Sequence, residues 1–134
     1  MRVEEHHEPG LLRLAATEKA LVNRPDWAPV LSMRRADTLL VALDLEQADF
    51  ISSLFLEACV ELGRELAASG QELVLLHLSA HQEGLLELVE GPLRLSVLKD
   101  DDQLARRLAE ITSRPGRQGQ EEGVSRNEKL MLWG

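Results

Sequence analysis

Two adjacent serines, Ser52 and Ser53, are the residues whose type and spacing most favour chemistry in this chain. They follow an apolar stretch ending at Phe50-Ile51 and precede a segment with helical periodicity. We expect Ser52 to be the helix N-cap, because a serine hydroxyl there accepts a hydrogen bond from a first-turn amide. Ser53 then lies in the first helical turn, near the positive end of the helix dipole. Phosphate on Ser53 meets unpaired N–H groups but adds about two negative charges, so Ser53 is a candidate phosphorylation site. The alternative is that both serines only cap the helix.

The sequence lacks the usual signatures of catalysis: a glycine-rich phosphate loop with its lysine, a Gly-x-Ser-x-Gly turn and a His-Glu-x-x-His helix. His77 and His81 are four residues apart, but we expect the first in a strand and the second in the next helix. Two ligands without a third do not meet the usual count for a metal site. A small-ligand binder or hydrolase that uses both histidines requires a pocket holding both imidazoles. Cys59 is alone and falls on the expected buried face of a helix, which favours a structural thiol. We therefore expect a protein that is not an enzyme, with no metal and no cofactor.

The elements that position the serines follow from hydrophobic periodicity. Near-continuous apolar runs predict buried central strands, and apolar residues every three or four positions predict amphipathic helices. The predicted strands are Val3 to Glu8, Gly10 to Leu14, Thr38 to Leu45, Glu72 to Leu78 and Leu95 to Leu98. The predicted helices are Trp27 to Met33, Ser52 to Ser69, Ser79 to Val89 and Asp100 to Ile111. This alternation predicts an α/β fold with a mostly parallel or mixed sheet of about five strands and about four helices.

Length, composition and charge exclude several functional classes. A chain of 134 residues is long enough for one small domain. Its net charge of −8 argues against nucleic-acid binding through phosphate attraction. The sequence has no apolar run long enough to span a membrane. The first residues, Met1 to Glu8, are acidic and lack the apolar stretch of a secretory signal, so we expect a cytoplasmic protein.

A change in composition after Thr112 marks the expected end of the domain, which we place at residues 1–112. Residues 113–134 are polar and glycine-rich at first, without periodicity, and predict a flexible tail. The chain ends in the apolar run Leu130-Met131-Leu132-Trp133. This run either is an unstructured terminus or docks on a partner or on a second copy, which would give a homodimer.

From Thr38 to about Ile111 the sequence resembles a STAS domain, the module of bacterial anti-sigma factor antagonists and of sulphate transporter tails. The resemblance rests on the apolar strand ending Phe50-Ile51, the serine pair opening a long helix, Ala67-Ala68-Ser69-Gly70 after Leu62 to Leu66, the strand Leu73 to Leu78, and Leu86-Glu87-Leu88 before Gly91. The family's strand-to-helix turn typically reads Asp-Ser-Ser/Thr-Gly-Leu, and a partner kinase phosphorylates the serine after the Asp. Aligned by Phe50-Ile51, that serine falls on Ser53.

The turn departs from the family pattern at three positions and is a divergent Ser-Ser variant. Ser52 stands where the family has Asp, Leu54 replaces the second hydroxyl, and Phe55 replaces Gly. A buried Phe55 would turn the helix slightly, whereas an exposed one would enlarge a docking surface.

The resemblance implies a non-enzymatic anti-sigma factor antagonist that binds a serine-kinase-type anti-sigma factor. The expected contact surface is the start of the Ser52 to Ser69 helix, with partner-binding residues Ser52, Ser53, Leu54, Phe55 and Glu57. Phosphorylation of Ser53 would oppose docking. The alternative is an unphosphorylated STAS-type scaffold or a transporter-associated adaptor subunit.

Overall fold

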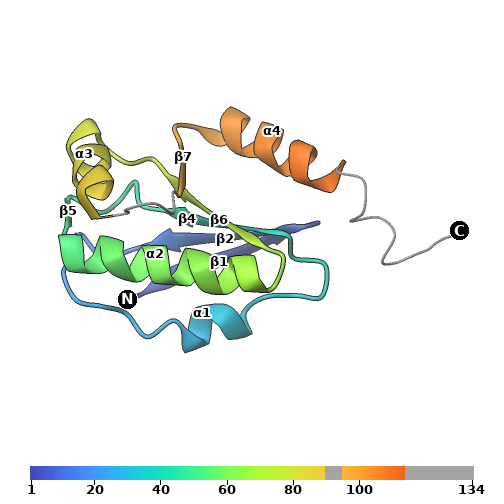
Figure 1. Ribbon diagram of the computed structural model, residues 1–134, viewed down its shortest axis with the longest axis horizontal. Helices are drawn as coiled ribbons and strands as arrows, with labels where there is room; N and C mark the ends of the chain where they lie inside the picture. The colour runs from blue at the N-terminus through green and yellow to red at the C-terminus, as the bar shows by residue number, and fades with distance from the viewer. Residues whose placement is uncertain (90–94, 114–134) are drawn as a thin grey trace, which may run out of the picture. The chain divides into compact units, whose positions relative to one another are not determined.

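The computed structural model of the chain describes residues 1–89 and 95–113. Within them, five strands form one mixed sheet in the order β1-β2-β4-β6-β7 (Figure 1). The strands are β1 (Val3–Glu8), β2 (Leu11–Ala16), β4 (Leu40–Asp44), β6 (Glu72–Leu76) and β7 (Ser96–Leu98). β1 is antiparallel to β2, and the other neighbours are parallel. The predicted α/β fold class is thereby confirmed.

The helices of the described residues are α1 (Ala28–Ser32), α2 (Ser53–Ala68), α3 (Ala80–Val89) and α4 (Asp101–Thr112). None of these helices combines the length and the apolar character that crossing a membrane requires. Residue contacts divide the chain into two units, Met1–Leu104 and the part from Ala105 onward. The sheet and every site discussed below belong to the first unit. In the second unit, the described residues 105–113 contain the end of α4. The expected tail lies outside the described residues from position 114 on, and so does the apolar run at 130–133.

α2 is amphipathic, as the periodicity predicts. Phe55, Cys59, Leu62 and Leu66 are buried and join the core formed with one face of the sheet. The helix ends at Ala68, and Gly70 follows with a left-handed φ of 76°; the N–H of Gln71 donates to the carbonyl of Leu66 at 2.9 Å. Glycine suits this position because it has no Cβ to clash there. The left-handed turn at Gly70 therefore terminates α2.

α3 begins with the predicted capping box. The hydroxyl of Ser79 accepts from the N–H of Gln82 at 3.1 Å, and the side chain of Gln82 accepts from the N–H of Ser79 at 2.9 Å. The Gln82 amide also donates to the carbonyl of Ala48 at 3.2 Å. This buried glutamine therefore ties α3 to the segment after β4.

Two short strands differ from the expectation. The apolar strand does not continue to Phe50-Ile51: β4 ends at Asp44, and Phe50–Ile51 form a separate strand, β5. β5 pairs in parallel with β3 (Ala20–Leu21) in a two-stranded sheet. Two residues are too few to show a period of two, so only long-range pairing determines these strands. β5 directly precedes α2 in the chain, and its pairing with β3 positions the start of this helix.

The segment around Trp27 packs on α2. The indole N–H of Trp27 donates to the carbonyl of Ala58 at 2.8 Å, and its ring lies 6.2 Å from the ring of Phe55. The predicted short helix is present as α1, with Pro29 near its first turn. The irregular N-terminal segment is therefore attached to the helix that carries Ser52 and Ser53.

Candidate functional site

Ser52 is the N-cap of α2, as predicted. Its backbone is extended, and its hydroxyl oxygen accepts a hydrogen bond from the N–H of Phe55 at 3.1 Å. The same hydroxyl donates to the carbonyl of Val22, just after β3, at 2.6 Å. Ser52 thus joins the start of α2 to the two-stranded sheet, and its hydroxyl is committed to structure.

Ser53 differs from Ser52 because its side chain is exposed and, within the described part of the chain, has no hydrogen-bond partner. It lies in the first turn of α2, where no acidic side chain neutralises the positive end of the helix dipole. Ser53 is therefore accessible in a field that favours a negative group.

Three exposed apolar side chains flank the serine pair. Val22 is 48% exposed, Phe50 55% and Leu54 41%. The described residues contain two other exposed large apolar side chains, Met1 and Leu88. We call Val22, Phe50, Ser53 and Leu54 the α2-start surface. Apolar side chains gathered around a polar group are typical of protein contact surfaces.

Two residues expected on the contact surface have other roles. Phe55 is only 1% exposed and packs on Trp27 in the core, so its side chain is not available to a partner. Glu57 is exposed, but it forms an ion pair with Arg24, 3.8 Å away. Arg24 also pairs with Glu61, so the charged border of the surface includes an arginine that the sequence analysis did not single out.

A hollow of about 300 Å³ lies beside the serine pair. It is open to solvent and is formed between the starts of α2 and α3, with side chains from Asp49, Phe50, Ile51, Ser52, Ser53, Ser79, His81, Gln82 and Leu85. His81 lines this hollow, whereas His77 does not. This hollow therefore does not supply the shared pocket that a site using both histidines requires.

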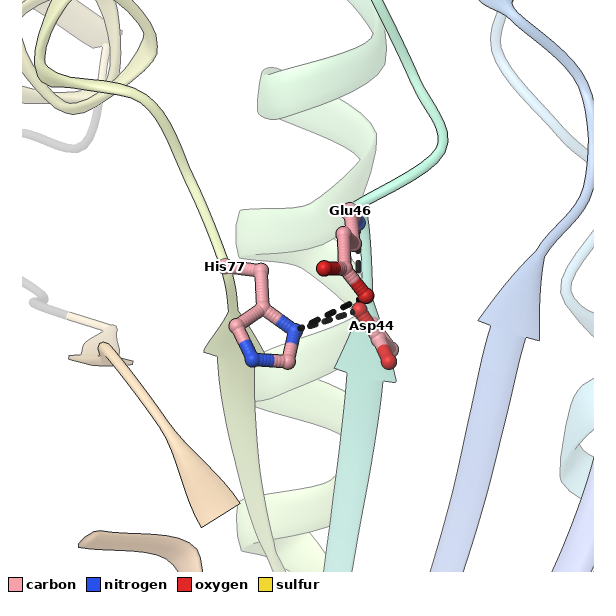
Figure 2. A group of neighbouring side chains, drawn as sticks. All are labelled: Asp44, Glu46 and His77. Carbon is pink, nitrogen blue, oxygen red and sulfur yellow. Dashed lines mark hydrogen bonds and ion pairs between the residues drawn. The ribbon is translucent and has the colours of Figure 1, made fainter.

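A second group of polar residues lies where β4 and β6 end, and Figure 2 shows three of its members. The Nδ1 of His77 is 2.9 Å from Oδ1 of Asp44 and 4.0 Å from Oε1 of Glu46. The other oxygen of Asp44 accepts from Arg13 of β2 at 2.9 Å. Arg13 also pairs with Asp101 at 3.1 Å. We call Arg13, Asp44, Glu46, His77 and Asp101 the strand-end cluster.

The surroundings of Asp44 favour its ionised form. Burial on its own raises the pKa of the Asp44 carboxyl, but hydrogen bonds from His77, Arg13 and the backbone N–H of Glu46 outweigh it. The pKa of Asp44 therefore lies below its usual range. For Arg13, burial lowers the pKa, but the contacts with Asp44 and Asp101 outweigh burial and raise it. Both groups are charged at neutral pH.

The strand-end cluster could not be predicted from local sequence patterns, because its members come from separate segments. The predicted strand includes His77, which is wrong: His77 directly follows β6 and has a left-handed φ of 66°. A usable signal was present: Asp44 ends one buried strand, and His77 follows the next one. The carboxyl ends of adjacent parallel strands lie at the same edge of a sheet, which is where α/β proteins commonly place their sites.

Comparisons with known proteins give a fold but no family. No protein-family model matches the chain, and no curated protein matches it. Among solved structures, the chain is similar to murine Solute Carrier 26 family member A9 (Slc26a9), an anion transporter in the inward-facing state, with a TM-score of 0.63 and 13% identity. The match covers 78% of this chain and 18% of the transporter chain, whose C-terminal part is a STAS domain. The chain therefore has a STAS-like fold.

Proposed function

We propose that this chain is a non-enzymatic, cytoplasmic regulator resembling an anti-sigma factor antagonist, which binds a serine-kinase-type anti-sigma factor through the start of α2. The observation that supports this proposal is the α2-start surface, where an exposed serine lies among three exposed apolar side chains. Burial of these side chains on docking would stabilise a complex by roughly 25 cal/mol for each Å² of apolar area removed from water.

Phosphorylation of Ser53 supplies the switch in this proposal. A phosphoserine in the first turn of α2 accepts hydrogen bonds from backbone N–H groups, so it leaves the helix intact. It also places about two negative charges between Phe50 and Leu54, on the surface that the partner must cover. Desolvation of that charge opposes binding, and the partner is released without unfolding of the regulator.

Phosphopeptide analysis tests the modification. The protein is incubated with the candidate anti-sigma kinase of its source organism and ATP, and the modified peptide is then located by mass spectrometry. We expect phosphate on Ser53 and none in the Ser53→Ala variant. Phosphate on another serine, or on none, would contradict the switch. Ser69, which is exposed at the opposite end of α2, is a suitable internal control.

A transporter-associated adaptor or unphosphorylated scaffold is the second candidate. The similarity in fold to part of an anion transporter favours it, and so does the absence of the family's Asp and Gly at the turn. Intact-mass measurement on protein purified from its native cells separates the two candidates. A fraction heavier by one phosphate group favours the switch, whereas a single unmodified mass favours the adaptor.

A further inference from the structure

Asp44, Glu46 and His77 present three potential metal ligands to one point. One atom from each side chain, two carboxylate oxygens and one imidazole nitrogen, lies within 4.8 Å of the other two. In Figure 2 the ring of His77 points toward both carboxylates. Donor atoms around a tetrahedral ion with bonds of about 2.1 Å lie about 3.4 Å apart. Small side-chain rotations therefore bring these three atoms to coordinating distances.

Two of the three ligands are held in place before any ion binds. Asp44 is only 7% exposed, and Arg13 and the backbone N–H of Glu46 each donate to its carboxylate. His77 is fixed through its backbone, because its N–H donates to the carbonyl of Leu98 in β7 at 3.1 Å. Such outer contacts orient the ligands of protein metal sites. Glu46, with 71% of its side chain exposed, is free to close over the ion.

The charge of the strand-end cluster suits a divalent cation. The cluster contains three carboxylates, those of Asp44, Glu46 and Asp101, and one guanidinium, that of Arg13. With a neutral imidazole the cluster has two uncompensated negative charges. Arg13 is itself paired by two of the carboxylates and contacts the Asp44 oxygen that does not face His77.

We propose that Asp44, Glu46 and His77 bind one divalent transition-metal ion of the Zn²⁺ type. The ion lies between Nδ1 of His77 and Oδ1 of Asp44, and the single ring proton of the neutral imidazole is then on Nε2. One imidazole and two carboxylates favour such an ion over Mg²⁺ or Ca²⁺, which prefer all-oxygen coordination. With three protein ligands, a fourth position is left for water or for a partner's ligand. This inference is independent of the proposed function.

Calorimetric titration of the metal-free protein with ZnCl₂ tests the site. We expect one equivalent to bind, and the Glu46→Gln variant to bind at least about tenfold more weakly. We expect binding to be lost in the His77→Asn variant, in which asparagine tolerates the left-handed backbone at position 77. Glu65→Gln, which removes an exposed carboxylate from α2, is the matched control and is expected to bind like the unmodified protein.

The histidines of β1 are the main competing ligands, because His6 lies 3.4 Å from Glu8 and His7 pairs with Glu5. A His6→Asn/His7→Asn double variant is therefore titrated in parallel. We expect it still to bind one Zn²⁺ ion per chain. The proposal is overturned if the protein binds no Zn²⁺, if the double variant loses the ion, or if Glu46→Gln binds unchanged. Equal affinity for MgCl₂ would also overturn it. Circular dichroism checks that the His77→Asn variant is folded. If His77→Asn is unfolded, the result for Glu46→Gln alone decides whether the proposal holds.

Discussion

The two serines at the start of α2 are neighbours in sequence with different structural roles. The hydroxyl of Ser52 has two backbone partners, Phe55 and Val22, whereas that of Ser53 points to solvent. This difference supports the assignment of structure to the first serine and of regulation to the second. The sequence alone was sufficient to predict it, because an N-cap and the residue after it are one position apart.

Removal of each hydroxyl should have unequal effects on stability. We expect Ser52→Ala to lower the free energy of unfolding by about 1–2 kcal/mol, because it removes the cap and leaves the carbonyl of Val22 without this donor. Ser53→Ala should change it by less than about 0.5 kcal/mol, since it breaks no contact. Urea denaturation of both variants measures the difference. Equal losses would show that Ser53 also has a structural role.

Asp44 is a residue at which the stability of the fold is expected to depend on pH. Its folded-state pKa lies below the ordinary value of 3.8. The ionised carboxylate therefore contributes stability that is fully present above about pH 5 and is lost as pH falls through the folded pKa. We expect the free energy of unfolding to decrease with acidification below about pH 4 and to decrease less in Asp44→Asn. At neutral pH this variant should itself be less stable by about 3 kcal/mol, because Arg13 and His77 lose their contact with the buried carboxylate.

Denaturation curves collected from pH 7 down to pH 2 check this prediction. Asp49→Asn is the matched control, because Asp49 is exposed and near the same edge of the sheet. The interpretation of Asp44 would be wrong if its variant and the control had the same acid dependence as the unmodified protein.

At the scale of elements, long periodic segments were predictable and short ones were not. The apolar runs that form β4 and β6 and the helical repeat of α2 each contain enough residues to define a period. β3 and β5 have two residues each, and only their pairing with one another defines them. The strand-end cluster also depends on long-range pairing, which local sequence patterns do not reveal. Its residues come together only when β2, β4 and β6 align in parallel.

Gln82 allows the coupling between elements to be measured. It completes the capping box of α3 and donates to the carbonyl of Ala48, and it is buried. We expect Gln82→Ala to lower the free energy of unfolding by about 2 kcal/mol, since a cap and a buried carbonyl both lose a partner. Gln47→Ala, at an exposed position one residue before Ala48, should change it by less than about 0.5 kcal/mol. Thermal unfolding of both variants tests this. Similar midpoints would mean that Gln82 does not tie α3 to the segment after β4.

At the scale of the whole molecule, the STAS-like fold places the starts of α2 and α3 and the strand-end cluster near the carboxyl ends of the parallel strands of the five-stranded sheet. The α2-start surface and the strand-end cluster are built from different residues, so each can be altered separately. The net charge of −8 disfavours association with a strongly acidic surface.

The most direct test of the proposed contact surface is a binding titration of the candidate anti-sigma kinase with three proteins: the unmodified chain, Ser53→Glu and Ser69→Glu. The two variants add the same charge to opposite ends of α2, and glutamate in the first turn is compatible with the helix dipole. We predict that Ser53→Glu raises the dissociation constant by at least about tenfold, which corresponds to about 1.4 kcal/mol, whereas Ser69→Glu leaves it unchanged. Unaltered binding of Ser53→Glu, or equal weakening by both variants, would contradict docking at the start of α2.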